Sequence, residues 1–138
     1  MAKQLSDRPT LEELNDFFGY DRFAEHAGCR IVEGSRDHAV CELDIQDHHR
    51  NALGNVMGGA IFTLADFALA IASNTGGNPS VSVSSTIEYL SASKGTCLIA
   101  TCNADKSGRR LGFYTTDVTD DTGRRIARVT ATVFRESE

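Results

Sequence analysis

The chain has 138 residues, 41% of them hydrophobic and 24% charged, and its formal net charge at pH 7 is −5. This length predicts a single domain over residues 1–138, large enough to bury a core but too small for two comfortable domains. The acidic balance argues against a nucleic-acid-binding protein, which normally carries a basic excess, although it is compatible with a local basic pocket.

The sequence also argues against export, membrane insertion and metal binding. The first residues, MAKQLSDRPTLEEL, lack the apolar core of a secretory signal. The longest apolar stretch, residues 60–72, is interrupted by Thr63 and Asp66 and is shorter than the ~20 residues of a membrane span. The four cysteines show no CxxC pairing and the four histidines lack zinc-ligand spacing. We therefore expect a cytoplasmic protein with reduced thiols, no membrane partner and no metal.

The first half of the chain predicts a short helix, then a strand or hairpin, then a long helix. Over residues 10–19, Thr10 is a candidate N-cap and Glu13 occupies the capping-box position. Residues 41–45 alternate apolar and polar, which is typical of a half-buried strand, and residues 46–55 are polar and predict a loop. A helical pattern covers residues 58–74 and ends at the turn-forming sequence TGGNPS.

The second half predicts four strands, over residues 81–90, 96–104, 111–119 and 125–134. Each is rich in β-branched or aromatic residues, and turn sequences separate them. Short connections between four consecutive strands predict an antiparallel meander. The whole order predicts an α+β fold in which an antiparallel sheet wraps around one long central helix.

A helical wheel divides the central helix into two stripes. One is apolar and suits a curved sheet: Ile61, Leu64, Ala65, Ala68 and Ala72. The other is small or polar: Gly59, Thr63, Asp66, Ala70 and Ser73. Asp66 therefore lies on a face that another backbone or a ligand can approach. One interpretation is a carboxylate that is hydrogen-bonded to a hydroxyl or faces the solvent. The other is a functional group, because ionisation is costly beside apolar neighbours and such residues concentrate in functional sites.

The pair Gly58-Gly59 begins this helix. It is either a tight entry turn or a place where unpaired N–H groups can hold a developing oxyanion. Asp66 lies eight residues further on, about 12 Å along the same helix. Because a carboxylate attacking that carbonyl must come within ~3 to 4 Å of its carbon, one helix cannot supply both groups. Two copies of the helix that run antiparallel about a two-fold axis could bring both groups together. This predicts a site shared between subunits.

The segment NALGNVMGGAIFTLAD resembles the signature of hotdog-fold acyl-CoA thioesterases of the phenylacetate-pathway and 4-hydroxybenzoyl-CoA type. The resemblance continues through SVSSTIEYLSASKG and KSGRRL and covers about the last two-thirds of the chain. It implies a sheet wrapped around the central helix and homo-oligomers, either dimers or dimers of dimers. It also implies hydrolysis of an acyl-CoA to the free acid and coenzyme A.

The same resemblance assigns roles to four residues. Asp66 is the catalytic carboxylate, acting as nucleophile or as general base, and the backbone N–H of Gly58 polarises the thioester carbonyl. Asn51 helps to place the carbonyl or the water, and Ser82 matches a hydroxyl near the attacking water. No cofactor is expected, because a thiolate leaves without strong acid assistance and coenzyme A is part of the substrate.

Two segments match those that line the coenzyme A channel in the family. They comprise Tyr89, Leu90, Ser91 and Lys94 in the first segment, and Lys106, Ser107, Gly108, Arg109, Arg110 and Leu111 in the second. The cations of the second segment are suited to the phosphates of the coenzyme. Without the resemblance this segment is an ordinary solvated turn, and Arg124-Arg125 is a rival basic cluster of that kind.

Met57 departs from the family pattern, which has histidine before the two glycines. A thioether neither titrates nor donates a strong hydrogen bond, so we interpret Met57 as a packing residue. The leading prediction is a thioesterase for a small or medium aliphatic or aromatic acyl-CoA. The alternatives are a non-catalytic acyl-CoA-binding protein and, with less support, an acyl-thioester hydratase or dehydratase, which usually needs a catalytic histidine.

Overall fold

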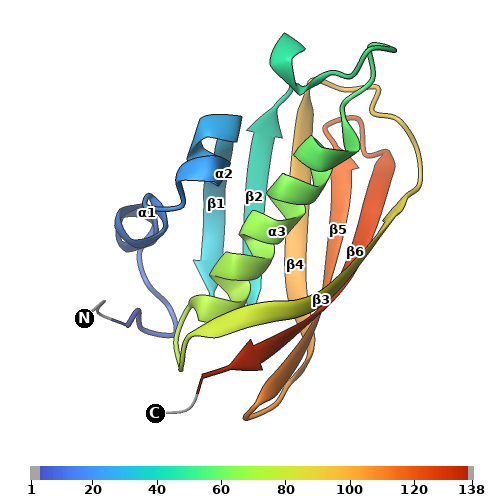
Figure 1. The fold of residues 1–138 in the computed structure, drawn as a ribbon. Helices are drawn as coiled ribbons and strands as arrows, with labels where there is room; N and C mark the ends of the chain where they lie inside the picture. The colour runs from blue at the N-terminus through green and yellow to red at the C-terminus, as the bar shows by residue number, and fades with distance from the viewer. Residues whose placement is uncertain (1–3, 137–138) are drawn as a thin grey trace.

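The computed structural model describes residues 4–136 (Figure 1). The helices are α1 (Leu11–Phe18), α2 (Arg22–Ala27), a short 3-10 helix η1 (Asp47–His49) and α3 (Gly58–Asn74). The strands are β1 (Cys29–Ser35), β2 (His38–Asp44), β3 (Ser80–Tyr89), β4 (Cys97–Ser107), β5 (Leu111–Asp120) and β6 (Arg125–Arg135). They form one antiparallel sheet in the order β1-β2-β4-β5-β6-β3.

The sheet curves around α3, which lies across its inner face (Figure 1). The apolar stripe of this helix is buried, and Leu64, Ala68 and Ala72 are each 0% exposed. Opposite them lie inward-facing residues of the central strands, such as Leu43 and Ala100. The α+β fold with a sheet around one central helix, which the sequence predicts, is therefore confirmed.

Local signals explain where the first two helices begin and end. The Thr10 hydroxyl accepts a hydrogen bond from Glu13 N at 3.1 Å, and the Glu13 carboxylate accepts one from Thr10 N at 2.9 Å. This capping box starts α1 at Leu11, within the helix expected over residues 10–19. The second helix, α2, begins after the N-cap Asp21 and ends at Gly28, whose φ of 96° lies in the left-handed region.

Three elements have no range of their own in the sequence prediction, although β1 and β2 form the hairpin that it leaves open. Helix α2 has only six residues, too few to show a clear helical period, and β1 carries exposed residues such as Val32 that weaken its alternation. The 3-10 helix η1 lies within residues 46–55, which the sequence predicts as a loop. The predicted strand 41–45 is the second half of β2, which begins at His38.

The predicted four-strand meander is wrong. Strand β3 pairs with β6, while β4 pairs with β2 on one side and β5 on the other. Because both edges of β4 are occupied, β3 is placed at the far edge of the sheet. The connection between β3 and β4 therefore crosses the ends of β5 and β6 instead of forming a hairpin turn, and Leu90 N donates to Ile126 O at 2.8 Å along the way.

Strand β3 forms an edge of the sheet and is largely exposed. Within residues 4–136 it pairs with β6 alone, and its Val81 and Val83 side chains are 53% and 60% exposed. Apolar residues on an unpaired edge are suited to pairing with another chain. None of the helices in the described part of the chain is long and apolar enough to cross a bilayer.

Candidate active site

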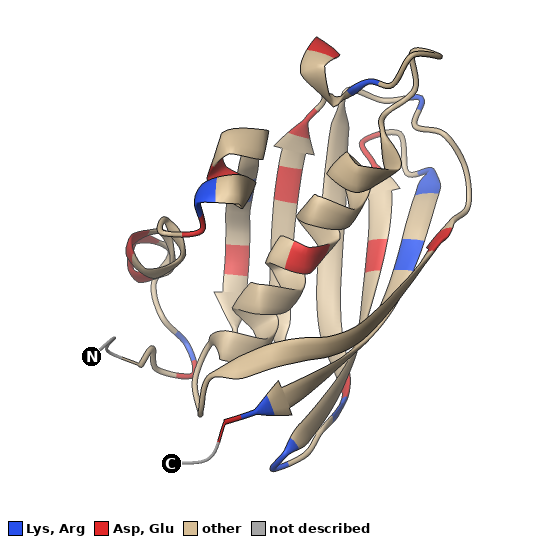
Figure 2. Ribbon diagram, viewed as in Figure 1, with Lys and Arg blue, Asp and Glu red and all other residues tan. Residues whose placement is uncertain are grey.

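Asp66 lies on the exposed side of α3, where it is the only charged residue of the helix (Figure 2). It lines a cleft of about 290 Å³ together with Ala70 and Ser73 of α3 and Ser80 and Ser82 of β3. The structure thus brings two predicted site residues, Asp66 and Ser82, to one cleft. Partial burial, with a smaller contribution from the nearby charge of Asp21, raises the pKa of Asp66 above its usual value.

The start of α3 carries the second predicted feature, a pair of unpaired N–H groups. Met57 occupies the N-cap position and makes no side-chain capping bond, and no acidic residue lies in the first turn. Among the described residues, none accepts a hydrogen bond from the N–H of Gly58 or Gly59. These donors, at the positive end of a 17-residue helix, can bind a carbonyl oxygen that develops negative charge.

Gly58 also borders a cavity of about 400 Å³ that includes Tyr89, Leu90 and Ser91. Tyr89 Oη donates to Gly58 O at 3.0 Å. A Cβ atom at position 58 would lie 2.8 Å from that Tyr89 oxygen, so a side chain there would have to displace the Tyr89 ring. Part of the first predicted coenzyme A segment therefore lies directly beside the predicted oxyanion site.

Asn51 shapes the loop that leads into α3. Its Oδ1 accepts hydrogen bonds from Leu53 N at 3.0 Å and Asn55 N at 3.1 Å, and its backbone N donates to Asn55 O at 2.8 Å. Its side-chain nitrogen has no acceptor within residues 4–136. This loop brings Asn51 to the same end of the molecule as Gly58, with one side-chain donor free for a substrate or water.

A third cavity, of about 420 Å³, lies on the α2 side of the α3 N-terminus. It is largely apolar and is lined by Phe23, His26, Ala27, His48, His49, Met57, Gly59, Ala60 and Thr63. Met57 lines this cavity and is 57% exposed, so within one chain it is not packed into the interior as the sequence interpretation expected. The helix N-terminus therefore separates this cavity from the one that contains Tyr89.

His49, which lies upstream of the glycines, is a structural residue. Gln46 N donates to its Nδ1 at 2.9 Å, so its Nε2 carries the proton and donates to Ala27 O at 2.6 Å. The side chain is 5% exposed and both nitrogens are occupied, which leaves none for proton transfer. Among the described residues, no three His, Cys, Asp or Glu side chains lie close enough to hold a metal ion.

The second predicted coenzyme A segment forms the turn between β4 and β5. Lys106, Arg109 and Arg110 make no ion pair with another described residue, whereas Arg125 of the rival cluster lies 3.8 Å from Asp117. Figure 2 shows the basic residues of this turn close to the end of β6. There Arg135 donates to Gly108 O and to Ser73 O, both at 3.1 Å, which joins the turn to the C-terminal part of α3.

The two predicted coenzyme A segments lie at opposite ends of the sheet. The register pairs Tyr89 with Ala127 near the start of β6, and Leu111 with Phe134 near its end. Strands of ten residues are about 33 Å long, so one chain does not bring the two segments together. Likewise, Asp66 and Gly58 line separate cavities.

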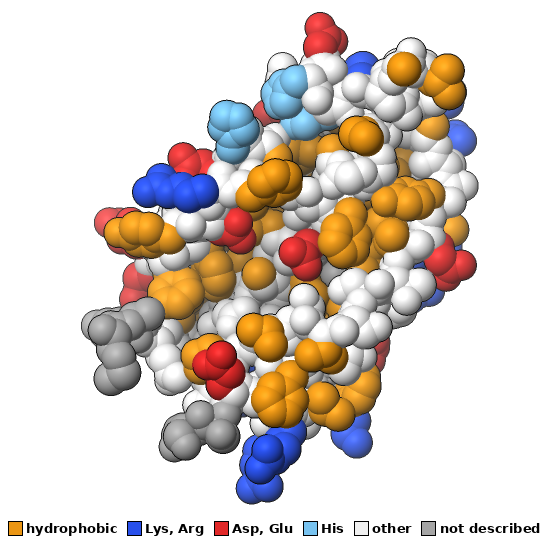
Figure 3. Space-filling model, in the orientation of Figure 1, with side chains coloured by type: hydrophobic (Ala, Val, Ile, Leu, Met, Phe, Trp, Pro, Cys, Tyr) orange, Lys and Arg blue, Asp and Glu red, His pale blue; other side chains and the backbone are white. Residues whose placement is uncertain are grey.

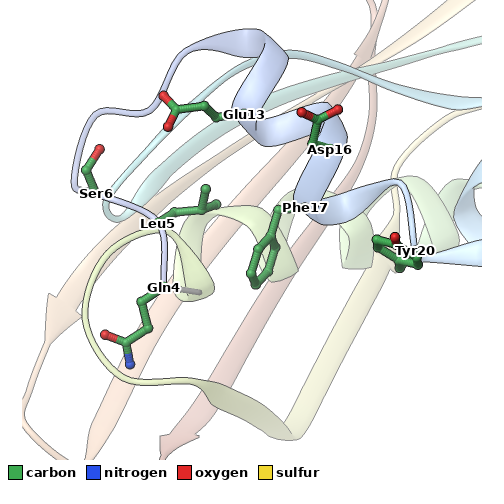
Figure 4. A pocket seen from close by; sticks show the side chains of 7 residues that line it. All are labelled: Gln4, Leu5, Ser6, Glu13, Asp16, Phe17 and Tyr20. Carbon is green, nitrogen blue, oxygen red and sulfur yellow. The ribbon is translucent and has the colours of Figure 1, made fainter. Parts of the chain in front are cut away.

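Another open cavity lies away from all of these residues. It has a volume of about 1050 Å³ and lies between the N-terminal segment and α1 (Figure 4). Leu5 comes from the segment, and Phe17 and Tyr20 come from the end of α1 and the residues that follow it. None of the predicted site residues lines it.

Comparison with known proteins identifies the family. The model of the family described as "Thioesterase superfamily" matches residues 53–127, which include Gly58, Asp66 and both coenzyme A segments. The chain belongs to the thioesterase superfamily. The predicted resemblance and the prediction of a thioester hydrolase are thereby confirmed.

Three similar proteins illustrate this membership. Acyl-coenzyme A thioesterase 13 of Mus musculus is 33% identical over 114 residues, which are 80% of this chain and 80% of that protein. A mutant of the phenylacetic acid degradation protein PaaI from Thermus thermophilus is 31% identical, with a TM-score of 0.79 over 84% of this chain and all of that chain. A hypothetical thioesterase from Streptococcus pneumoniae, determined with coenzyme A, is 27% identical, with a TM-score of 0.80 over 90% and 98% of the two chains.

Sequence reasoning missed Asp21 and the cavity beside Met57. Asp21 influences Asp66 from α2, and the cavity takes Phe23, His26 and Ala27 from the same helix. Two signals could have revealed this helix, namely Asp21 as its N-cap and Gly28 at its end. Without α2, nothing in the sequence places these residues beside α3.

Proposed function

We propose that the protein hydrolyses acyl-CoA thioesters at a site shared between two antiparallel subunits. The observation that carries the proposal is the division of the predicted site residues into two groups. The cleft that contains Asp66 and Ser82 extends from the middle of α3 toward the end of the molecule that holds the turn from Lys106 to Leu111, and Gly58, Asn51 and the segment from Tyr89 to Lys94 lie toward the other end. Each group supplies part of the groups that the reaction needs, and a two-fold axis near Thr63, in the first half of α3, would bring the two groups together.

The exposed face of α3 and the free edge of β3 support a homo-oligomer, either a dimer or a dimer of dimers. Hydrophobic side chains gather over this face of the molecule (Figure 3). Thr63 lies between Gly59 and Asp66 on the helix, so antiparallel contact around it would place Asp66 of each subunit near the glycine pair of the other.

In the proposed reaction, the thioester oxygen accepts a hydrogen bond from Gly58 N–H of one subunit. Asp66 of the other subunit either removes a proton from water, whose oxygen then attacks the carbonyl carbon, or attacks that carbon itself and forms a mixed anhydride that water then hydrolyses to release the acid and restore Asp66. In both routes the C–S bond breaks, the electron pair leaves with the coenzyme A thiolate, and that sulfur gains a proton that the water supplies. Asn51 and Ser82 place the carbonyl and the water, and the chemistry requires no metal or further cofactor.

The coenzyme A half of the substrate would contact both predicted segments, one from each subunit. Lys106, Arg109 and Arg110, which form no ion pair within residues 4–136, are suited to its phosphates. The acyl half would occupy the cavity of about 420 Å³ beside Met57 and Phe23, across the helix N-terminus from Tyr89. That size and apolar lining suit a small or medium aliphatic or aromatic group. A cytoplasmic location is part of the proposal and rests on the cysteine pattern.

Met57 favours one alternative, a non-catalytic acyl-CoA-binding protein. It places no titratable group where the family has histidine, and His49 nearby has both nitrogens occupied. The same features weigh against a hydratase or dehydratase that depends on histidine. Binding of acyl-CoA without turnover would distinguish the binding protein from the thioesterase.

The test follows thiol release from a panel of acyl-CoAs, with wild type compared to Asp66→Ala. We expect wild-type turnover that the substitution lowers at least ~100-fold, because a positioned acid–base or nucleophilic group is lost. Asp16→Ala, which removes an exposed carboxylate from α1, is the matched control and should retain wild-type rates. Binding without release across the panel, or unchanged turnover in Asp66→Ala, would contradict the proposal.

A further inference from the structure

The loop between β3 and β4, which lines the Gly58 cavity, is held by a carboxylate that lies outside that cavity. Asp120 is the last residue of β5 and is 1% exposed. Among residues 4–136 it is the one Asp or Glu side chain that is fully buried. Such a group requires hydrogen-bond partners, because an unpaired buried charge is very costly.

One oxygen of Asp120 binds the loop. Its Oδ2 accepts hydrogen bonds from Ser93 Oγ at 3.0 Å, Lys94 N at 2.8 Å and Gly95 N at 3.0 Å. Three donors from consecutive residues fix both the backbone and one side chain of this part of the loop.

The other oxygen binds the turn between β5 and β6. Its Oδ1 accepts from Thr122 Oγ1 at 2.6 Å, from Thr122 N at 3.0 Å and from Arg124 N at 3.1 Å. Burial alone would raise the pKa of Asp120, but the hydrogen bonds from Thr122, Lys94, Ser93 and Arg124 lower it well below its usual value. Asp120 therefore stays ionised and joins the loop to the sheet.

Close packing at Gly95 shows that the loop lies directly on this turn. A Cβ atom at position 95 would lie 1.8 Å from Asp121 Oδ1 and 3.3 Å from Asp120 Cβ. A side chain at position 95 would have to displace the Asp121 carboxylate, so the lack of a Cβ atom lets the loop pack directly against this turn.

Ser93 links this anchor to the site. It lines the cavity that contains Gly58 and Tyr89, and its hydroxyl donates to Asp120. The next residue, Lys94, is exposed, and its backbone N is fixed by the same carboxylate oxygen, which sets where its ammonium group can reach.

We propose that Asp120 is a positioning residue for coenzyme A: it holds Ser93 to Gly95 so that the cavity wall and Lys94 are ready to bind the coenzyme half of the substrate. This inference rests on the proposed function, because it assumes that the cavity beside Gly58 receives coenzyme A. A residue that only stabilised the β5–β6 turn would affect every substrate and ligand alike. A positioning residue affects coenzyme A selectively.

The experiment compares wild type, Asp120→Asn and Asp117→Asn. Asp117 is the matched control, because it lies on the same strand β5 but its carboxylate is paired with Arg128 at 3.5 Å and Arg125 at 3.8 Å and accepts no hydrogen bond from Ser93, Lys94 or Gly95. The measurements are the Kd of coenzyme A by titration calorimetry, the melting temperature, and steady-state kinetics. Kinetics use an acyl-CoA and the N-acetylcysteamine thioester of the same acyl group, which lacks the nucleotide.

We expect the Kd of coenzyme A and the KM of the acyl-CoA to rise by roughly tenfold or more in Asp120→Asn, with kcat within about threefold of wild type, because a displaced binding wall costs affinity before chemistry. Turnover of the N-acetylcysteamine thioester should change little, and Asp117→Asn should retain wild-type affinity. If Asp120→Asn does not fold, Ser93→Ala replaces it and should raise the Kd by about threefold, since it removes one donor. An unchanged Kd, or equal losses on both substrates, would overturn the inference.

The outcomes also separate this inference from the proposed function. Wild type that binds coenzyme A but releases no thiol would overturn the thioesterase proposal, while the Kd values would still decide the role of Asp120. Wild type that turns over acyl-CoA while Asp120→Asn binds coenzyme A normally would overturn only the positioning role. Wild type that does neither would overturn both.

Discussion

The ionisation of Asp66 depends on two features of its surroundings. Partial burial on α3 raises its pKa, and the negative charge of Asp21 on the neighbouring helix raises it further. Both roles proposed for Asp66, nucleophile and general base, require the carboxylate form. The activity should therefore fall as the pH is lowered through the raised pKa of Asp66.

Replacing Asp21 by Asn tests this electrostatic contribution. The change removes a charge that raises the pKa of Asp66, so the acid limb of the kcat/KM profile should move to lower pH. Asn is also a good N-cap, so α2 should be retained. The measurement is kcat/KM for an acyl-CoA as a function of pH, with Asp47→Asn as a control from η1. A shift toward higher pH, or the same shift in both variants, would count against the assignment.

At the scale of elements, α3 serves the core and the site with different faces. Leu64 and Ala68 are fully buried against the sheet, while Asp66 between them faces the cleft beside β3. The alanines on the inner face let the helix lie close to the strands. Any loss of packing under α3 would therefore also displace Gly58 and Asp66.

A pair of leucine substitutions tests the buried face. Leu64→Ala removes a side chain that is 0% exposed and should lower the free energy of unfolding by about 2–5 kcal/mol, because it leaves a cavity under the helix. Leu53→Ala, in the loop before α3, removes a side chain that is 86% exposed and should change stability little. Urea denaturation of both variants gives the comparison, and equal losses would contradict the packing described for α3.

The sequence predicts the individual helices and strands better than it predicts which strands lie side by side. The period of residues 58–74 predicts α3 and its buried stripe, because both depend on local geometry. The placement of β3 beside β6 depends on pairing between distant segments, which strand propensity does not encode. Helix α2 was missed because it has only six residues, and the sequence leaves β1 open as part of a possible hairpin because its exposed residues weaken the alternation.

The site could likewise be predicted only in part, where its residues stand out locally in the sequence. Asp66 stands out as a carboxylate in an apolar helix, and the rise per residue separates it from Gly58. The coenzyme A segments were identified by resemblance alone. The role inferred for Asp120 could not be read from the sequence, because its partners Ser93, Lys94 and Gly95 lie about 25 residues away.

At the scale of the whole molecule, the account depends on two incomplete half-sites. One chain presents a carboxylate cleft toward one end and free N–H groups at the other, and the basic turn lies far from the Tyr89 segment. An antiparallel partner would complete both half-sites at once, giving two equivalent sites in each dimer.

The most direct test of this shared site mixes two inactive variants, Asp66→Ala and Gly58→Val, after unfolding and refolding together. Random pairing makes about half of the dimers hybrid, and each hybrid retains one intact site, so about a quarter of wild-type activity should return. Each variant refolded alone should stay inactive. If mass spectrometry shows that hybrids form and they release no thiol from acyl-CoA, the two half-sites do not act together and the account is wrong.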